Sequence, residues 1–167
     1  MITLADFDPQ VVAEHHITEQ TLERVIRYVR LLQGEDAPTL QDIAIGGYYG
    51  TSALLHEVVE LDILLEREPR LLEMDRDTIL TFWHANEDAH AEALVSEYKY
   101  LRDVIQRLFD VTVDIGALVV ANASDWDLDL LVESDVGGPL FKPDDEQVRR
   151  ASTLLARLRA MNGKEAI

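Results

Sequence analysis

The chain has 167 residues, the size of one ordinary domain, and 47% of them are hydrophobic, enough to bury a core. It carries 32 acidic against 15 basic residues, a formal net charge of −17, and we find no basic cluster. We therefore expect no binding to nucleic acid and none to anionic membrane surfaces. The absence of cysteine excludes disulfides, thiolate metal sites and a cysteine nucleophile.

The N-terminal residues predict no targeting segment. Residues 1–10 include Asp6 and Asp8 but neither a basic start nor a long apolar run, so we expect no signal peptide. The longest apolar stretches, such as residues 115–121, are far shorter than the roughly 20 residues that a membrane span needs. Together with the lack of cysteine, these features favour a cytoplasmic protein.

Helical periodicity recurs along the chain, whereas the alternation typical of strands hardly appears. Residues 1–16 are expected to form a loosely ordered N-terminal segment. A first helix is predicted to begin after an N-cap at Thr18 and to stop at Gly34, because apolar residues repeat between them at three- and four-residue steps.

The middle of the chain is predicted to hold a loop and a second helix. Residues 35–50, rich in glycine, are expected to be a loop with one short turn at residues 40–45. The second helix is predicted from about Thr51 to Glu68, since the residue before Pro69 is disfavoured in the α conformation.

The third predicted helix is the longest, from Asp75 or Asp77 to Phe109, and its acidic first turn suits the positive end of the helix dipole. Two short helices, at residues 114–122 and 124–133, are expected to follow it.

A break at residues 137–139 and a last helix after Asp144 complete the pattern. The apolar stripe of the last helix could pack inside the molecule or against a second copy in a homodimer. As a whole the pattern predicts a single all-α domain, residues 1–167, built as a bundle of four main helices with one or two short additional helices.

Ionisable residues fall on the apolar face of the third predicted helix. Glu87, His90 and Glu97 lie at about 340°, 280° and 260° from Leu80, close to the apolar arc at about 280–340°. A buried carboxylate or imidazole must be paired, hydrogen-bonded or bound to a metal. Glu87 and His90 have the Glu-x-x-His spacing of di-iron bundles, but those sites need it twice and it occurs once here, so a full ferritin-like site is not expected.

The second predicted helix offers partners for these residues. His56 and Glu60 are one turn apart, which favours them as a pair, whereas the helical wheel favours Asp62, at about 80° from Leu54 inside the apolar arc. Both alternatives remain open. The segment around His56 resembles the His-Glu-x-x-His helix of zinc metalloproteases, but Glu60 replaces the second histidine, so that mechanism is not expected.

We therefore predict a divalent-metal site between the second and third helices. Its candidate ligands are His56, Glu60, Asp62, Glu87 and His90. Nitrogen and oxygen ligands suit Zn, Fe or Mn. If the protein is an enzyme, metal-assisted hydrolysis is the expected class: the ion lowers the pKa of a bound water, and a spare carboxylate, Glu57 or Glu97, takes the proton.

The alternative is that these ionisable groups are structural. His56 with Glu60 would then be a solvated pair on the helix surface, and the buried groups of the third helix would be hydrogen-bonded or paired with arginines of the first. The candidate arginines are Arg24, Arg27 and Arg30. The protein would in that case be a non-enzymatic interaction protein, such as an inhibitor, an antitoxin-like protein or an assembly module, which presents its carboxylates to a basic protein partner.

Overall fold

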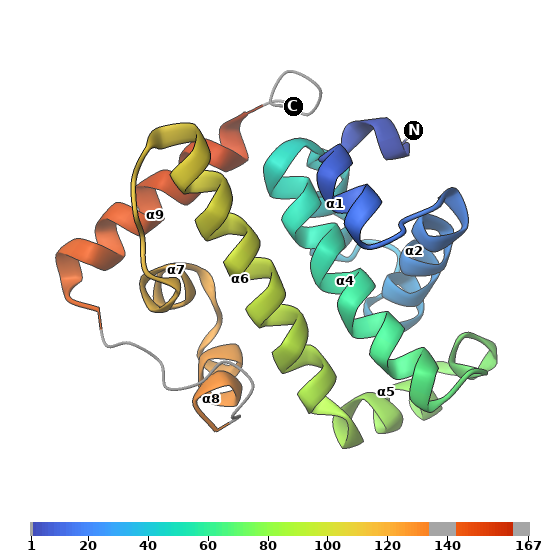
Figure 1. The fold of residues 1–167 in the computed structure, drawn as a ribbon. Helices are drawn as coiled ribbons and strands as arrows, with labels where there is room; N and C mark the ends of the chain where they lie inside the picture. Colours follow the sequence, from blue (N-terminus) through green and yellow to red (C-terminus); the bar gives the residue numbers. More distant parts are fainter. Residues whose placement is uncertain (1, 134–142, 162–167) are drawn as a thin grey trace.

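The computed structural model describes residues 2–133 and 143–161, and all regular elements in these two ranges are helical (Figure 1). In chain order they are η1 (Leu4–Asp6), α1 (Pro9–Glu14), α2 (Glu19–Gln33), α3 (Pro38–Ile45), α4 (Gly47–Arg67), η2 (Leu71–Glu73), α5 (Arg76–Ala85), α6 (Glu87–Phe109), α7 (Ile115–Asn122), α8 (Asp125–Glu133) and α9 (Asp145–Ala160). The predicted all-α class is confirmed. The break expected at residues 137–139 lies outside the described residues.

Local capping signals set the ends of several helices. The Thr18 hydroxyl accepts a hydrogen bond from the Thr21 amide at 3.1 Å, and Gly34, with φ of 98°, ends α2. At the start of α9, the Asp144 carboxylate accepts one from the Gln147 amide at 2.8 Å. These ends agree with the sequence-based expectation.

The segment expected to be mainly a loop is largely helical. Gly46 and Gly47 have positive φ values of 67° and 60°, a conformation that glycine adopts without steric cost. The chain therefore turns sharply between α3 and α4, and α4 begins four residues before Thr51.

The long third helix was predicted wrongly as one element. It is divided at Asn86, whose backbone leaves the helical region (φ −131°, ψ 40°) and whose side chain donates to the Phe82 carbonyl at 2.8 Å. The chain changes direction there, so a helical wheel drawn through α5 into α6 loses its phase.

Helices α4 and α6 run side by side through the centre of the molecule (Figure 1). One hydrophobic cluster, drawn from η1 through α5, packs on the α4 side, and a second one, drawn mainly from α6, α7 and α9, packs on the other. Phe7 and Val11, in the segment for which loose order was expected, are buried in the first cluster. The seam between α4 and α6 therefore lies between two apolar cores.

Helix α4 has contacts on most of its circumference, and polar side chains are buried along it. Among the described residues, the buried polar side chains other than Asp8 all belong to α4: Thr51, Ser52, His56, Glu57 and Glu60.

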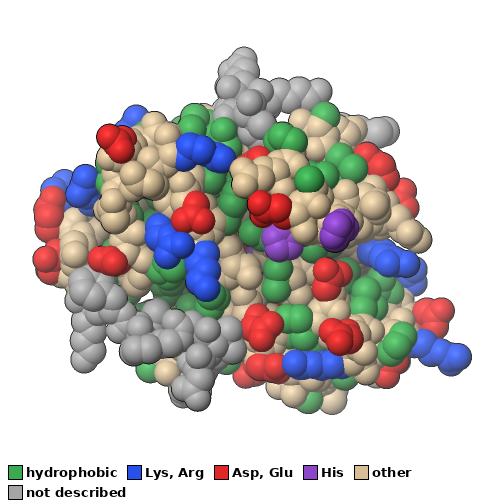
Figure 2. Space-filling view, in the orientation of Figure 1, with side chains coloured by type: hydrophobic (Ala, Val, Ile, Leu, Met, Phe, Trp, Pro, Cys, Tyr) green, Lys and Arg blue, Asp and Glu red, His purple; other side chains and the backbone are tan. Residues whose placement is uncertain are grey.

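On the face drawn in Figure 2, Asp and Glu side chains are spread among Lys and Arg. Within residues 2–133 and 143–161, none of the helices combines the length and the apolar character that a membrane crossing requires.

Candidate metal centre

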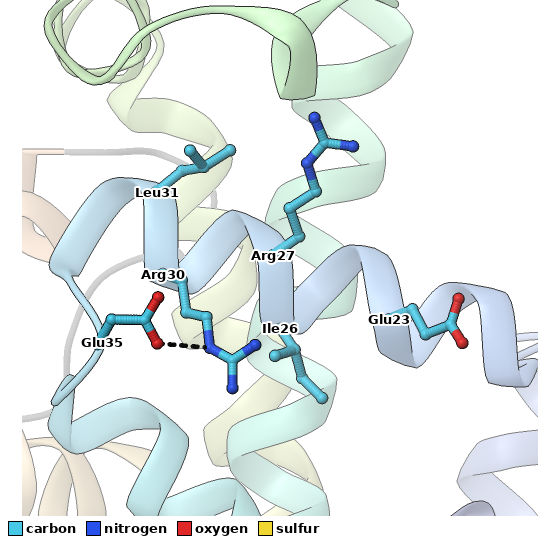
Figure 3. A pocket seen from close by; sticks show the side chains of 6 residues that line it. All are labelled: Glu23, Ile26, Arg27, Arg30, Leu31 and Glu35. Carbon is cyan, nitrogen blue, oxygen red and sulfur yellow. Dashed lines mark ion pairs between the residues drawn. The ribbon is translucent and has the colours of Figure 1, made fainter.

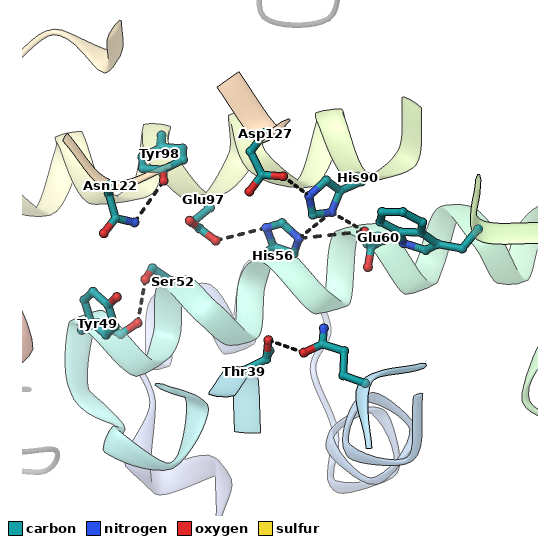
Figure 4. A network of polar contacts seen from close by, with 12 residues as sticks. Thr39, Tyr49, Ser52, His56, Glu60, His90, Glu97, Tyr98, Asn122 and Asp127 are labelled. Atoms are coloured by element: carbon teal, nitrogen blue, oxygen red, sulfur yellow. Dashed lines mark hydrogen bonds and ion pairs between the residues drawn. The ribbon is translucent and has the colours of Figure 1, made fainter. Parts of the chain in front are cut away.

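Three side chains from α4 and α6 bring their donor atoms together in the seam (Figure 4). His56 and Glu60 lie one turn apart on α4, and His90 lies in the first turns of α6. Nδ1 of His90 is 2.6 Å from Oε1 of Glu60 and 3.2 Å from Nε2 of His56, and the latter two atoms are 3.9 Å apart.

These separations fit a bound metal ion. The circle through the three atoms has a radius of about 2.0 Å, which matches the roughly 2.0–2.2 Å bonds from zinc to histidine nitrogen and carboxylate oxygen. A tetrahedral ion with these bond lengths needs its ligand atoms about 3.3 Å apart. The pairs at 2.6 and 3.9 Å would therefore have to shift by about 0.6–0.7 Å for one ion to bind all three donors at tetrahedral angles.

Each imidazole also faces a carboxylate with its second nitrogen. Nδ1 of His56 lies 3.1 Å from Oε1 of Glu97, as an ion pair rather than an aligned hydrogen bond. Nε2 of His90 lies 2.9 Å from Oδ1 of Asp127 on α8. Carboxylates in this outer position fix the tautomer and the orientation of metal-binding histidines.

The Glu60 carboxylate is held by two further helices. Its Oε2 accepts a hydrogen bond from the Tyr28 hydroxyl of α2 at 3.0 Å, and its Oε1 accepts one from Nε1 of Trp83 of α5 at 3.2 Å. These contacts leave Oε1 directed at the histidines.

The surrounding carboxylates favour positive charge on the imidazoles. Burial by itself lowers the pKa of His56, but the adjacent carboxylates, Glu97 foremost, outweigh burial and raise the pKa to about 10. For His90, burial again lowers the pKa, and the contacts with Asp127 and Glu60 raise it to about 9. The cluster therefore suits a cation, whether protons or a metal ion supply the charge.

The two α4 glutamates respond in opposite ways. Burial opposes ionisation of Glu60, but the hydrogen bond and the charges of the histidines outweigh it and lower its pKa. Glu57 is 4% exposed, and burial together with the charge of Glu60 raises its pKa to about 8. Its Oε2 has no hydrogen-bond partner among the described residues.

Two of the sequence-predicted ligands lie elsewhere. Asp62 is exposed on α4, where helices on several sides leave no single apolar arc for a wheel to identify. Glu87 is separated from the expected arc by the break at Asn86, and its Oε1 lies 3.3 Å from Nδ1 of exposed His84. His56 and Glu60 are buried, so the alternative of a solvated pair is wrong.

Two of the three candidate arginines of the first predicted helix, Arg27 and Arg30, have their partners outside the cluster. Arg27 donates to the Leu72 carbonyl at 2.6 Å, and Arg30 pairs with Glu35 at 3.2 Å. Both line a surface pocket of about 550 Å³ on α2 (Figure 3).

Sequence reasoning missed three residues of the centre. Tyr28 and Trp83 lie on apolar faces, and a buried hydroxyl or indole N–H normally needs a partner, which is a signal that could have been used. Asp127 carries no such signal, because only the fold brings α8 to α6.

Comparisons with protein-family models, curated proteins and solved structures gave no match for this chain.

Proposed function

We propose that the protein binds one divalent ion, Zn, Fe or Mn, through Nε2 of His56, Oε1 of Glu60 and Nδ1 of His90. The observation that carries this proposal is the orientation of each imidazole. One ring nitrogen of each histidine faces the position between the three donor atoms, and the other ring nitrogen faces a carboxylate.

The facing ring nitrogens support a metal rather than protons alone. His56 Nε2 and His90 Nδ1 are 3.2 Å apart, so in the metal-free protein, where both rings are protonated, the two N–H groups oppose each other as donors. A metal ion accepts a lone pair from both nitrogens and from Glu60 at once.

Three protein ligands leave a coordination position for water, which is the pattern of catalytic rather than structural zinc. The ion would lower the pKa of that water and produce a nucleophile for hydrolysis. Glu97 is engaged with His56, whereas Oε2 of buried Glu57 has no partner. We therefore assign to Glu97 the role of orienting His56, and to Glu57 that of proton acceptor, because the charge of a bound ion would lower the raised pKa of Glu57 and leave its carboxylate ionised.

Metal analysis of the purified protein tests the binding step. After treatment with chelator and dialysis against Zn²⁺, Mn²⁺ or Fe²⁺, we expect one ion per chain in the wild type and in His84→Ala. We expect loss of the ion in His90→Ala and in Glu60→Gln. His84 is the matched control, because it is an exposed imidazole outside the cluster.

A chain that takes up no metal and melts at the same temperature with and without chelator would contradict the proposal. It would favour the non-enzymatic acidic interaction protein, in which the same cluster is only structural.

Cobalt substitution tests the hydrolytic role without a known substrate. The visible spectrum of the Co²⁺ protein should change with pH as the bound water ionises near pH 7. Glu57→Gln should keep the cobalt but slow hydrolysis of the probe p-nitrophenyl acetate by about 10²–10⁴-fold, the usual contribution of a general base. A spectrum without a pH-dependent step, or an unimpaired Glu57→Gln, would remove the hydrolytic part of the proposal.

A further inference from the structure

We propose that Asp127 is a positioning residue of the metal centre and that it couples metal binding to the docking of α8 on α6. This inference rests on the proposed function and adds to it a residue and an element that the sequence did not indicate.

Helix α8 meets the centre through two consecutive side chains. Asp127 contacts Nε2 of His90 at 2.9 Å, and the indole of Trp126 stacks on that of Trp83 with ring centres 5.4 Å apart and 30° between the planes. The Trp126 ring also lies 5.6 Å from the His90 ring. Both contacts involve residues that border the metal position.

The start of α8 is arranged for this contact. The Ser124 hydroxyl accepts a hydrogen bond from the Asp127 amide at 3.1 Å, which caps the helix. Leu131, one turn after Asp127 on the same face, is buried in the second hydrophobic cluster. Among the described residues that contact the three candidate ligands through charge or hydrogen bonds, Asp127 alone comes from beyond α6. The centre is therefore complete only when α8 is docked.

Coupling follows from the chemistry of the imidazole. A metal on Nδ1 makes Nε2–H a stronger donor to the Asp127 carboxylate, and the carboxylate in turn increases the basicity of Nδ1. Binding free energies are reciprocal. If docking of α8 raises the affinity for the metal by a given factor, metal binding must raise the equilibrium constant for docking by the same factor.

The first test compares Asp127→Asn with Asp129→Asn by chelator competition for Zn²⁺. Asp129 is exposed on the same helix, so its variant removes the same charge without touching His90. We expect Asp127→Asn to bind Zn²⁺ about 10–100-fold more weakly, the usual effect of removing an outer carboxylate. Asp129→Asn should match the wild type, and Asp127→Glu should recover part of the loss.

The second test follows α8 itself. The chain has two tryptophans, Trp83 and Trp126, and both border the centre. Zn²⁺ should shift the tryptophan emission of the wild type to shorter wavelength as α8 docks, and this shift should disappear in Asp127→Asn. Melting temperatures of the metal-free and Zn²⁺-loaded variants distinguish a positioning role from a purely structural one. The melting temperature of Asp127→Asn should fall further below that of Asp129→Asn when zinc is present.

Equal Zn²⁺ affinity of the two asparagine variants, or a stability deficit that zinc does not change, would overturn the role of Asp127 and leave the metal site standing. A wild-type chain that binds no Zn²⁺, Mn²⁺ or Fe²⁺ would overturn both.

Discussion

The two histidines of the centre are buried among carboxylates, and in the metal-free protein protons must supply the charge that the ion would bring. Burial, which alone would discharge an imidazole, is outweighed at His56 by Glu97 and at His90 by Asp127 and Glu60. The same side chains that would bind the metal or orient its ligands therefore make the stability of the metal-free protein sensitive to pH.

For the chelator-treated protein we predict that stability falls as pH rises from 6.5 to 9. The pKa values of His56 and His90 rise from 6.5 to about 10 and about 9, and that of Glu57 rises from 4.5 to about 8, so the folded chain holds protons that the unfolded chain has released. Each such proton changes the free energy of unfolding by up to about 1.4 kcal/mol per pH unit. Denaturant unfolding at several pH values measures the slope.

His90→Gln should flatten this slope, and His84→Ala should not. On the acid side, the lowered pKa of Glu60 means that its contribution is lost as pH falls below 4.5. Between pH 6.5 and 9 the stabilisation that metal binding provides should increase with pH, since deprotonated histidines bind the ion more tightly. A stability that stays level or rises over this range in the chelator-treated protein would refute the assigned pKa values.

Tyr28 is predicted to support Glu60 in a measurable way. Tyr28→Phe removes the hydrogen bond to a buried, charged carboxylate, and we expect it to lower the free energy of unfolding by about 1–3 kcal/mol. Tyr98→Phe, which loses a bond with the neutral amide of Asn122, should cost less, about 0.5–1.5 kcal/mol. Urea denaturation measures both, and equal costs would show that Glu60 does not depend on Tyr28.

At the scale of the helices, the sequence predicted those ends that depend on local chemistry. Thr18, Gly34 and Asp144 end or begin helices through bonds or backbone conformations of their own segments. The break at Asn86 was missed, because a single non-helical residue scarcely disturbs the spacing of apolar residues on either side.

The same distinction holds for the site. His56 and Glu60 could be paired from their spacing on one helix, and His90 from its place among apolar residues. The wheel failed for Asp62, because several helices surround α4, and nothing local could predict that Asp127 reaches His90 from α8. Residues that meet only through tertiary packing remain beyond periodicity arguments.

The packing of α3 on α4 leads to a prediction at Gly50. A Cβ atom at this position would lie 3.0 Å from the Ile43 carbonyl oxygen and 3.3 Å from that of Asp42. Gly→Ala inside a helix normally stabilises by up to about 1 kcal/mol, but here backbone must move, and we expect a loss of about 1–3 kcal/mol. Thermal or denaturant unfolding of Gly50→Ala measures the sign of the change in stability. Ala53→Gly in the same helix measures the effect of the difference in helix propensity between alanine and glycine. A stabilised Gly50→Ala would show that α3 does not approach so closely.

For the whole molecule, the main feature is a polar centre between two apolar cores. The α4–α6 seam joins the cluster that includes Phe7 and Tyr28 to the cluster that includes Leu101 and Leu118. An ion bound by both helices would tie the two halves together, and at 100 times its Kd it would add about 2.7 kcal/mol to the free energy of unfolding.

The net charge of −17 predicts a general salt effect. Like charges repel one another in the folded state, and salt screens that repulsion. The melting temperature of the metal-free protein should therefore rise as NaCl is increased from low concentration to physiological ionic strength. A fall would mean that local ion pairs such as Arg67 with Asp88 outweigh the overall repulsion.

X-ray absorption of the zinc-loaded protein tests the central claim most directly, because it reports the atoms around the ion and not only its presence. The account predicts scattering from two imidazoles and a carboxylate oxygen at about 2.0–2.2 Å, and no such shell when zinc is added to His90→Ala. A shell of oxygen atoms alone, or one that His90→Ala leaves unchanged, would show that His56, Glu60 and His90 do not hold the metal.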